Sequence, residues 1–239
     1  LAWQLKLLAN RNELLHLRKG IYRLQSHIVK NIIAIGLSPF FMNVASCFIV
    51  IFINKGLKEY DGDLAIGAYG IVNRLVFICV MIVMGITQGM QPIAGYNYGA
   101  KQYSRVKETF WMTAKFGTIV TTICFAIGMF IPRLAAGIFT HDEALLAMSA
   151  EGLRILTIGF PIVGFQMIGT NFFQCLGMVK KSIILSLSRQ LLFLLPLLYT
   201  LPMWMGANGV WMSFPISDLL SAALTAILLR RLFRKFNTL

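Results

Sequence analysis

Charged residues are scarce in this chain, and acidic residues are the scarcest of them. Only 13% of its 239 residues are charged, with nine Asp and Glu in all, whereas 57% are hydrophobic. The mean hydropathy is +0.72. A soluble domain has too little interior to bury that much apolar surface. These proportions exclude an ordinary soluble protein and indicate a helical membrane protein.

The sequence motifs of common enzymes are also missing. The chain contains no HExxH, no Walker-type glycine loop and no Gly-x-Ser-x-Gly. Its three histidines, His16, His27 and His141, fall in connections or near a membrane surface, so none is placed for metal binding or for a proton relay inside the membrane. We therefore expect neither an enzyme nor a bound metal or organic cofactor.

Cysteine is rare as well, and no two cysteines form a CxxC pair. All four lie within apolar runs, so we interpret them as small apolar packing residues that form neither disulfides nor metal sites. They are Cys47, Cys79, Cys124 and Cys175.

What the chain has in abundance is apolar runs of about 20 residues, the length that crosses a bilayer as a helix. Six are present, and we predict an all-α integral membrane protein with six transmembrane helices. The predicted spans are residues 28–53, 66–93, 109–131, 152–174, 182–203 and 209–229. The longest connection has about 15 residues, too few to fold as a soluble domain.

Basic residues are distributed unevenly over the connections. The 22 Lys and Arg give a formal net charge of +13, but no basic cluster is interleaved with aromatic residues as in a nucleic-acid face. Fifteen of them lie before or in the first turn of the first span, follow the second or fourth span, or lie in the tail; only Lys55, Lys58 and Arg133 occupy the alternate connections. Because basic residues collect on the cytoplasmic side, we expect both ends of this chain in the cytoplasm, and no nucleic-acid partner.

These spans divide the chain into three predicted parts. Residues 1–27 are a cytoplasmic linker that begins with the end of a preceding helix, residues 28–229 form a six-helix lobe, and residues 230–239 form a basic cytoplasmic tail. The first residue is Leu, not Met, and we expect that the opening of the natural chain is absent.

Several predicted spans carry polar side chains at membrane depth, where each costs free energy unless it is paired or wetted. In the second span, small, aromatic and polar residues recur every three or four positions, which helix packing and a cavity wall both explain. Prolines inside four spans permit kinks, as in transporters whose helices bend around a wet cavity. The candidate cavity residues are Asn43, Phe77, Met81, Gln88, Gln166, Asn171 and Gln174.

Three of the charged residues within the predicted spans are expected to be buried and structural: Arg74, Arg189 and Asp218. The depths of Arg189 and Asp218 differ by about 5–6 Å at ~1.5 Å per residue, which is within an arginine's reach. We interpret them as an ion pair that fixes helix packing. An ion or proton site at Asp218 is the alternative, since carboxylates inside membranes often serve as one.

The end of the second span reads GITQGMQPIAGYNYGAK from Gly85 to Lys101. Its Gln-Pro pair, its Gly-Tyr-Asn-Tyr-Gly run and the basic loop that follows resemble the eighth helix of the multidrug and toxic compound extrusion (MATE) transporters. Further segments that resemble the family occur in the family's order, one before this motif at residues 68–74 and four after it at residues 153–155, 188–190, 209–211 and 214–218. The resemblance runs from about Gly20 to the C-terminus.

The resemblance implies that this chain is the second half, helices seven to twelve, of a twelve-helix transporter whose partner is the missing N-terminal six-helix lobe. Such proteins are antiporters that export amphipathic, often cationic drugs or toxic compounds by alternating access, in exchange for H+ or Na+. Two alternatives stay open: a lipid-linked oligosaccharide flippase of the same broad superfamily, and a non-transporting membrane scaffold. A flippase would need several basic cavity residues for a pyrophosphate, and Arg74 is the one good candidate.

The acidic residues point to one branch of the family. NorM-type members carry cation-binding carboxylates on helices seven and ten, but residues 28–53 contain no Asp or Glu, and the fourth span has only Glu151 at its border. The chain is therefore similar to the DinF-type, MepA-like branch, in which coupling is attributed to an aspartate on helix one. We accordingly expect the ion-coupling residue in the missing lobe.

Overall fold

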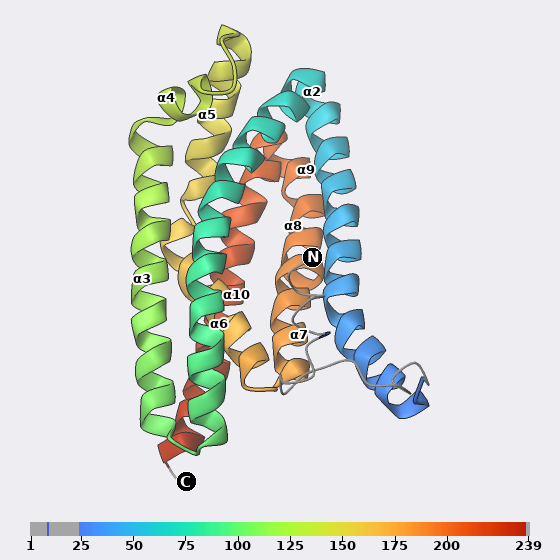
Figure 1. Ribbon diagram of the computed structural model, residues 1–239. Helices are drawn as coiled ribbons and strands as arrows, with labels where there is room; N and C mark the ends of the chain where they lie inside the picture. The colour runs from blue at the N-terminus through green and yellow to red at the C-terminus, as the bar shows by residue number, and fades with distance from the viewer. Residues whose placement is uncertain (1–8, 10–23, 238–239) are drawn as a thin grey trace. The chain divides into compact units, whose positions relative to one another are not determined.

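The computed structural model describes Ala9 and residues 24–237, and every regular element among them is a helix (Figure 1). The chain divides into two compact units, Leu1–Asn43 and Val44–Leu239. The first unit contains the start of α2 (Ser26–Gly99), and most of the predicted linker, residues 1–27, lies outside the described residues. The helices that follow α2 all lie in the second unit.

Helix α2 is far too long to cross a membrane once. Its part Asn43–Gly99 has 57 residues and a mean hydropathy of 2.1, which would make a rod about 85 Å long against a hydrocarbon core of ~30 Å. At Gly62 the backbone takes φ 74° and ψ −162°, a conformation that only glycine adopts readily. The chain reverses there, so residues 44–61 and 63–99 form a first and a second arm within the second unit (Figure 1).

The helices that follow α2 account for the remaining predicted spans. They are α3 (Tyr103–Phe130), α4 (Pro132–Gly137), α5 (Glu143–Thr157), α6 (Phe160–Cys175), α7 (Val179–Leu187), the π-helix η1 (Ser188–Leu194), α8 (Leu195–Thr200), α9 (Pro202–Met205) and α10 (Ala207–Asn237). Among the described residues, four helical segments, counting 43–99 as one, are long and apolar enough to span a membrane; α5 and α6, bent by 58°, make a fifth if they form one span.

Each of the six predicted spans falls on helix. The first two lie on α2, the third on α3, the fourth on the bent pair, the fifth on the run from α7 to α9, and the sixth on α10. The predicted tail differs in one respect, because α10 continues through it to Asn237. Arg234 and Lys235 occupy its last turn, where positive charge interacts favourably with the helix dipole.

Alternate connections of the second unit lie at opposite ends. The α2–α3 and α6–α7 connections share one end with the end of α10, whereas the reversal in α2, α4 and the α9–α10 connection lie at the other (Figure 1). Lys107 on α3 donates to the side chain of Asn237, and the Tyr103 ring stacks 4.8 Å from that of Phe236. The connections richest in basic residues therefore share one end; which side of the membrane that end faces stays a prediction.

Two apolar clusters form the interior of the second unit. One joins both arms of α2 to α5, α6, α8 and α10 around the buried Trp211, whose ring centroid is 6.0 Å from that of Tyr69. The other joins α3, α6 and α10 through aromatic rings such as Phe110 and Phe172, 4.8 Å apart. These clusters set α6 between α3 and α10.

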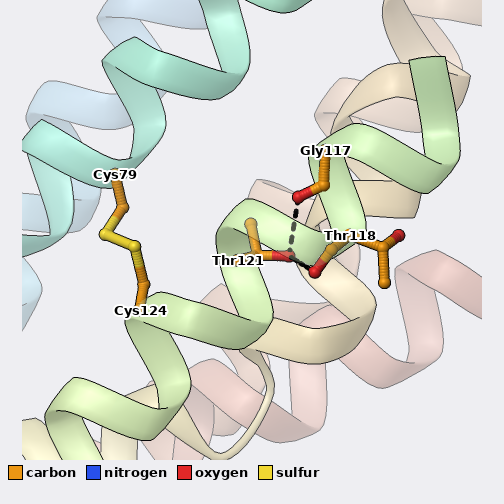
Figure 2. The surroundings of a disulfide bond; sticks show 5 residues. All are labelled: Cys79, Gly117, Thr118, Thr121 and Cys124. Atoms are coloured by element: carbon orange, nitrogen blue, oxygen red, sulfur yellow. Dashed lines mark hydrogen bonds between the residues drawn. A yellow bond between two sulfur atoms is a disulfide. The ribbon is translucent and has the colours of Figure 1, made fainter.

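One prediction about the cysteines is wrong. Cys79 on α2 and Cys124 on α3 form a disulfide, with their Cα atoms 6.5 Å apart (Figure 2). The two lie 45 positions apart, each inside an apolar run, so nothing in their spacing predicts the pair; the packing of the second arm of α2 beside α3 creates it. Cys47 and Cys175 are free, as predicted.

Candidate functional site

A polar groove of about 470 Å³ lies between the second arm of α2 and α6. Four lining residues come from α2 and two from α6, and five of the six are amides or hydroxyls. They are Met84, Thr87, Gln88, Gln91, Asn171 and Gln174. A groove lined by so many polar side chains in a helical membrane protein can accept water or a solute, which makes it the candidate functional site.

Several polar side chains of the groove make few hydrogen bonds within the protein. The Thr87 hydroxyl donates to the carbonyl of Val83 at 2.7 Å, and the Asn171 amide donates to the carbonyl of Met167 at 2.9 Å, which leaves the Asn171 side-chain oxygen as an acceptor. Three further side-chain amides make no hydrogen bond within the described residues: those of Gln88, Gln91 and Gln174. Their donors and acceptors are available to a solute.

The structure brings together three of the seven predicted cavity residues: Gln88, Asn171 and Gln174. Phe77 and Met81, 58% and 46% exposed, lie earlier on the same arm of α2 and do not line the groove. Asn43 is exposed and ends the first unit, so it is described apart from the groove. The substrate role of all seven stays a prediction.

Gln166 lies elsewhere than expected. Its side chain is 3% exposed, and its amide nitrogen donates to Ser221 Oγ at 3.1 Å and to Thr170 Oγ1 at 3.4 Å. Gln166 and Thr170 share the face of α6 that packs on α10, whereas Asn171 and Gln174 share the neighbouring face. Gln166 therefore does not line this groove, and its place in a substrate cavity stays a prediction.

Three residues of the groove were not among the predicted cavity residues: Met84, Thr87 and Gln91. Met84 precedes Gln88 by four residues and Gln91 follows it by three, so helical periodicity puts them on its face. The predicted stripe instead joined Gln88 to Phe77 and Met81. Sequence periodicity finds such a face but does not say which of two overlapping stripes a neighbouring helix covers.

The predicted ion pair between Arg189 and Asp218 is present. Arg189 Nε donates to Asp218 Oδ1 at 2.6 Å, with the arginine side chain 33% exposed and the aspartate side chain 4% exposed. Arg74 differs from its expectation, because its side chain is exposed on α2, and it makes no ion pair within the described residues. An apolar run predicts that Arg74 lies within a span, but it does not predict the direction in which the side chain points.

A second cavity, of about 340 Å³, lies beside the disulfide of Figure 2. Apolar side chains of α2, α3 and α5 line nearly all of it, with Thr157 as the one hydroxyl, and that hydroxyl donates to the carbonyl of Leu153 at 2.8 Å. It therefore offers little to orient a ligand, and the polar groove is the stronger candidate site.

The comparison with known families now decides the identity of the bundle. The model of the MatE family matches residues 34–200. This chain belongs to the MatE family. The multidrug export protein MepA of Staphylococcus aureus (strain NCTC 8325 / PS 47) is 27% identical over 207 residues, which are 87% of this chain and 45% of MepA. MepA of Staphylococcus saprophyticus is 24% identical over 224 residues, 94% of this chain and 49% of that protein.

Solved MATE structures agree with this assignment. The multidrug transporter DinF-BH, solved in complex with a ligand, is 38% identical with a TM-score of 0.78, over 92% of this chain and 49% of that one. An outward-facing multidrug resistance MATE transporter of the MOP superfamily superposes with a TM-score of 0.85 over 98% of this chain and 52% of that one; at 18% identity it shows the fold alone. The predicted likeness to DinF-type, MepA-like members is confirmed, and the chain spans about half the length of these relatives.

Proposed function

We propose that this chain is the C-terminal six-helix lobe of a secondary active antiporter that exports amphipathic, often cationic compounds by alternating access. The N-terminal six-helix lobe of the same polypeptide is its proposed partner, and H+ or Na+ influx is its proposed energy source. Family membership and the half-length match to multidrug export proteins support this proposal. The observation that carries it is the groove of uncommitted amides between α2 and α6.

The groove suits a broad range of solutes. Gln88, Gln91 and Gln174 offer both hydrogen-bond donors and acceptors, and Met84 offers an adaptable apolar contact. No carboxylate is among the residues that line it. A cation would therefore meet amide oxygens here, and aromatic faces such as the exposed Phe77 nearby, rather than a fixed negative charge.

The proposed transport needs no covalent chemistry and no metal or organic cofactor, because the ion gradient supplies the free energy. We propose that the residue that couples transport to the ion gradient lies in the N-terminal lobe. We also propose that the basic connections face the cytoplasm of a bacterial cell, with both ends of this chain on that side.

The test measures dye accumulation in cells that express the complete transporter. The panel consists of fluorescent organic cations and includes the compound bound in the DinF-BH structure. We expect cells with the transporter to accumulate less dye, and the double variant Gln88→Leu, Asn171→Leu to weaken apparent affinity by about tenfold, because two hydrogen-bonding groups are lost. Gln102→Leu is the matched control, since Gln102 is exposed at the start of α3 and makes no side-chain cap.

Two results would contradict the proposal. Equal accumulation with and without the transporter across the whole panel would exclude multidrug export. Unchanged transport in the double variant would remove the groove from the substrate path, and a stabilised double variant that recruits partners without transporting would favour the scaffold alternative.

A further inference from the structure

Three irregularities of the backbone meet at the Arg189–Asp218 ion pair. The break of 58° between α5 and α6 lies at Gly159, where an added Cβ would be 3.1 Å from the Cα of Pro215 and 3.5 Å from the Cβ of Asp218. Arg189 lies in the π-helix η1, and Pro215 interrupts the hydrogen bonding of α10 one turn before Asp218. Bends and π-helices mark places where helices change shape, and here all three surround one buried carboxylate.

The ion pair is built so that it can open. It consists of one hydrogen bond, from Arg189 Nε to Asp218 Oδ1, rather than the two of a bidentate pair. Within the described residues, neither side chain makes a hydrogen bond other than this one. The Arg189 side chain is a third exposed and has room to leave the pair, whereas the carboxylate is only 4% exposed.

Arg189 is also the one charged partner that the described structure gives Asp218. Tyr69 on α2 packs its ring on Phe214, one turn before Asp218, and Cys175 lies half-buried at the far end of α6. The other titratable residues of α5, α7 and α8, which pack on α10, are exposed: Glu143, Glu151, Arg154, Lys180, Lys181 and Tyr199. Those of α10 itself are exposed in its last two turns: Arg230, Arg231, Arg234 and Lys235. If Arg189 withdraws, nothing else neutralises the buried carboxylate, and it must bind a proton.

An acceptor for that proton lies on the neighbouring helix. Gln166 Oε1 is buried and has no hydrogen-bond donor among the described residues, while its amide nitrogen donates to Ser221, one turn after Asp218. The buried face of α10 continues this polar line with Ser217, Ser221 and Thr225, each at most 1% exposed. A protonated Asp218 would be a donor one helical turn from Ser221, which binds the amide of Gln166.

We propose that Asp218 is a proton-binding site that controls the bend between α5 and α6. Unprotonated, Asp218 pairs with Arg189 and holds Gly159 of the α5–α6 break against α10. A proton taken up on Oδ2 neutralises the carboxylate, releases Arg189 towards solvent and lets the carboxyl donate to Gln166 Oε1. The bend relaxes because the charge that fixed η1 to α10 at this point is gone.

The proposal rests on the proposed function only for its consequence for transport, so its test measures the bend directly. Spin labels at Ala147 on α5 and Lys115 on α3, both exposed, report the position of α5 relative to the α3–α6 pair in the complete transporter. Cys47 and Cys175 are first replaced by Ser, because they are the free cysteines. A second label pair, at Lys115 and Ala226 on α10, does not cross the bend and is the control.

We expect the Ala147–Lys115 distance to shift between alkaline and acidic pH in the wild type, while the control distance stays constant. Asp218→Asn should lose the shift and keep the acidic-pH distance throughout. Because that variant leaves Arg189 without its counter-ion, the doubly neutral Arg189→Gln, Asp218→Asn variant accompanies it and should also lose the shift. Glu151→Gln, an exposed carboxylate on α5, should keep it.

A pH-dependent shift that persists unchanged in the doubly neutral variant would overturn the proposal, as would a wild-type distance that does not respond to pH. These outcomes are independent of dye export. A transporter that shows the shift but exports none of the dyes contradicts the proposed function alone, and one that exports dyes without the shift contradicts this proposal alone.

Discussion

Gly164 on α6 lies so close to α3 that a Cβ added to it would be 2.8 Å from the carbonyl oxygen of Gly117. The same Cβ would be 2.6 Å from Thr121 Oγ1, whose hydroxyl donates to the carbonyls of Gly117 and Thr118 (Figure 2). Small residues on facing helices let their backbones approach in a membrane, where packing rather than the hydrophobic effect holds helices together.

Gly164→Ala is therefore expected to lower the free energy of unfolding by about 1–3 kcal/mol, because part of the obstruction is backbone and cannot rotate away. Thermal unfolding of the purified protein in detergent, followed by tryptophan fluorescence, measures the effect. Gly85→Ala is the matched control: its Cβ meets nothing within 4 Å, and a helical Gly→Ala change there is neutral or slightly stabilising. Equal melting temperatures for the two variants would mean that α3 and α6 are not in close contact.

The reversal of α2 gives a second prediction. Because Gly62 has φ 74° and ψ −162°, Gly62→Ala should cost about 1–3 kcal/mol of backbone strain even though its Cβ would meet no atom within 4 Å. Gly70→Ala, on the second arm and also without contacts, isolates the effect of the backbone conformation. The same unfolding measurement decides between them, and a Gly62→Ala protein as stable as Gly70→Ala would show that the chain does not turn at Gly62.

Hydropathy predicted where the helices lie because each apolar run of membrane length must satisfy its own backbone hydrogen bonds. It also predicted the Arg189–Asp218 pair, since two opposite charges at similar depth have few other partners. It did not predict which side chains a neighbouring helix covers. Gln166 and Asn171 look alike in the sequence, yet one is sealed against α10 and the other lines the groove.

The disulfide marks the same limit, because contacts between helices leave no trace in the spacing of two cysteines. We expect that, without reductant, a thiol-alkylating reagent modifies the unfolded protein only at Cys47 and Cys175, and that Cys79 and Cys124 react after reduction. Peptide mass spectrometry identifies the modified positions. Chain-entropy arguments give the cross-link at most about 4 kcal/mol, so reduction should also lower the melting temperature. Alkylation of all four cysteines in the unreduced protein would contradict the pairing.

The last prediction concerns Gln166. A buried amide whose oxygen lacks a hydrogen bond contributes little to the free energy of unfolding. Gln166→Leu removes the unpaired Oε1 and the hydrogen bond to Ser221, and the serine hydroxyl can turn to its own helix backbone, so the free energy of unfolding should change by less than about 1 kcal/mol. Phe172→Ala, at another fully buried position of α6, should cost about 3–5 kcal/mol through the cavity it leaves.

If Gln166 accepts the proton of Asp218, however, Gln166→Leu should shift the pH dependence of the α5–α6 bend to lower pH, since the protonated form loses its acceptor. A polar residue that is dispensable for stability but needed for the pH response has a role in the working cycle; one whose loss unfolds the protein as Phe172→Ala does is structural.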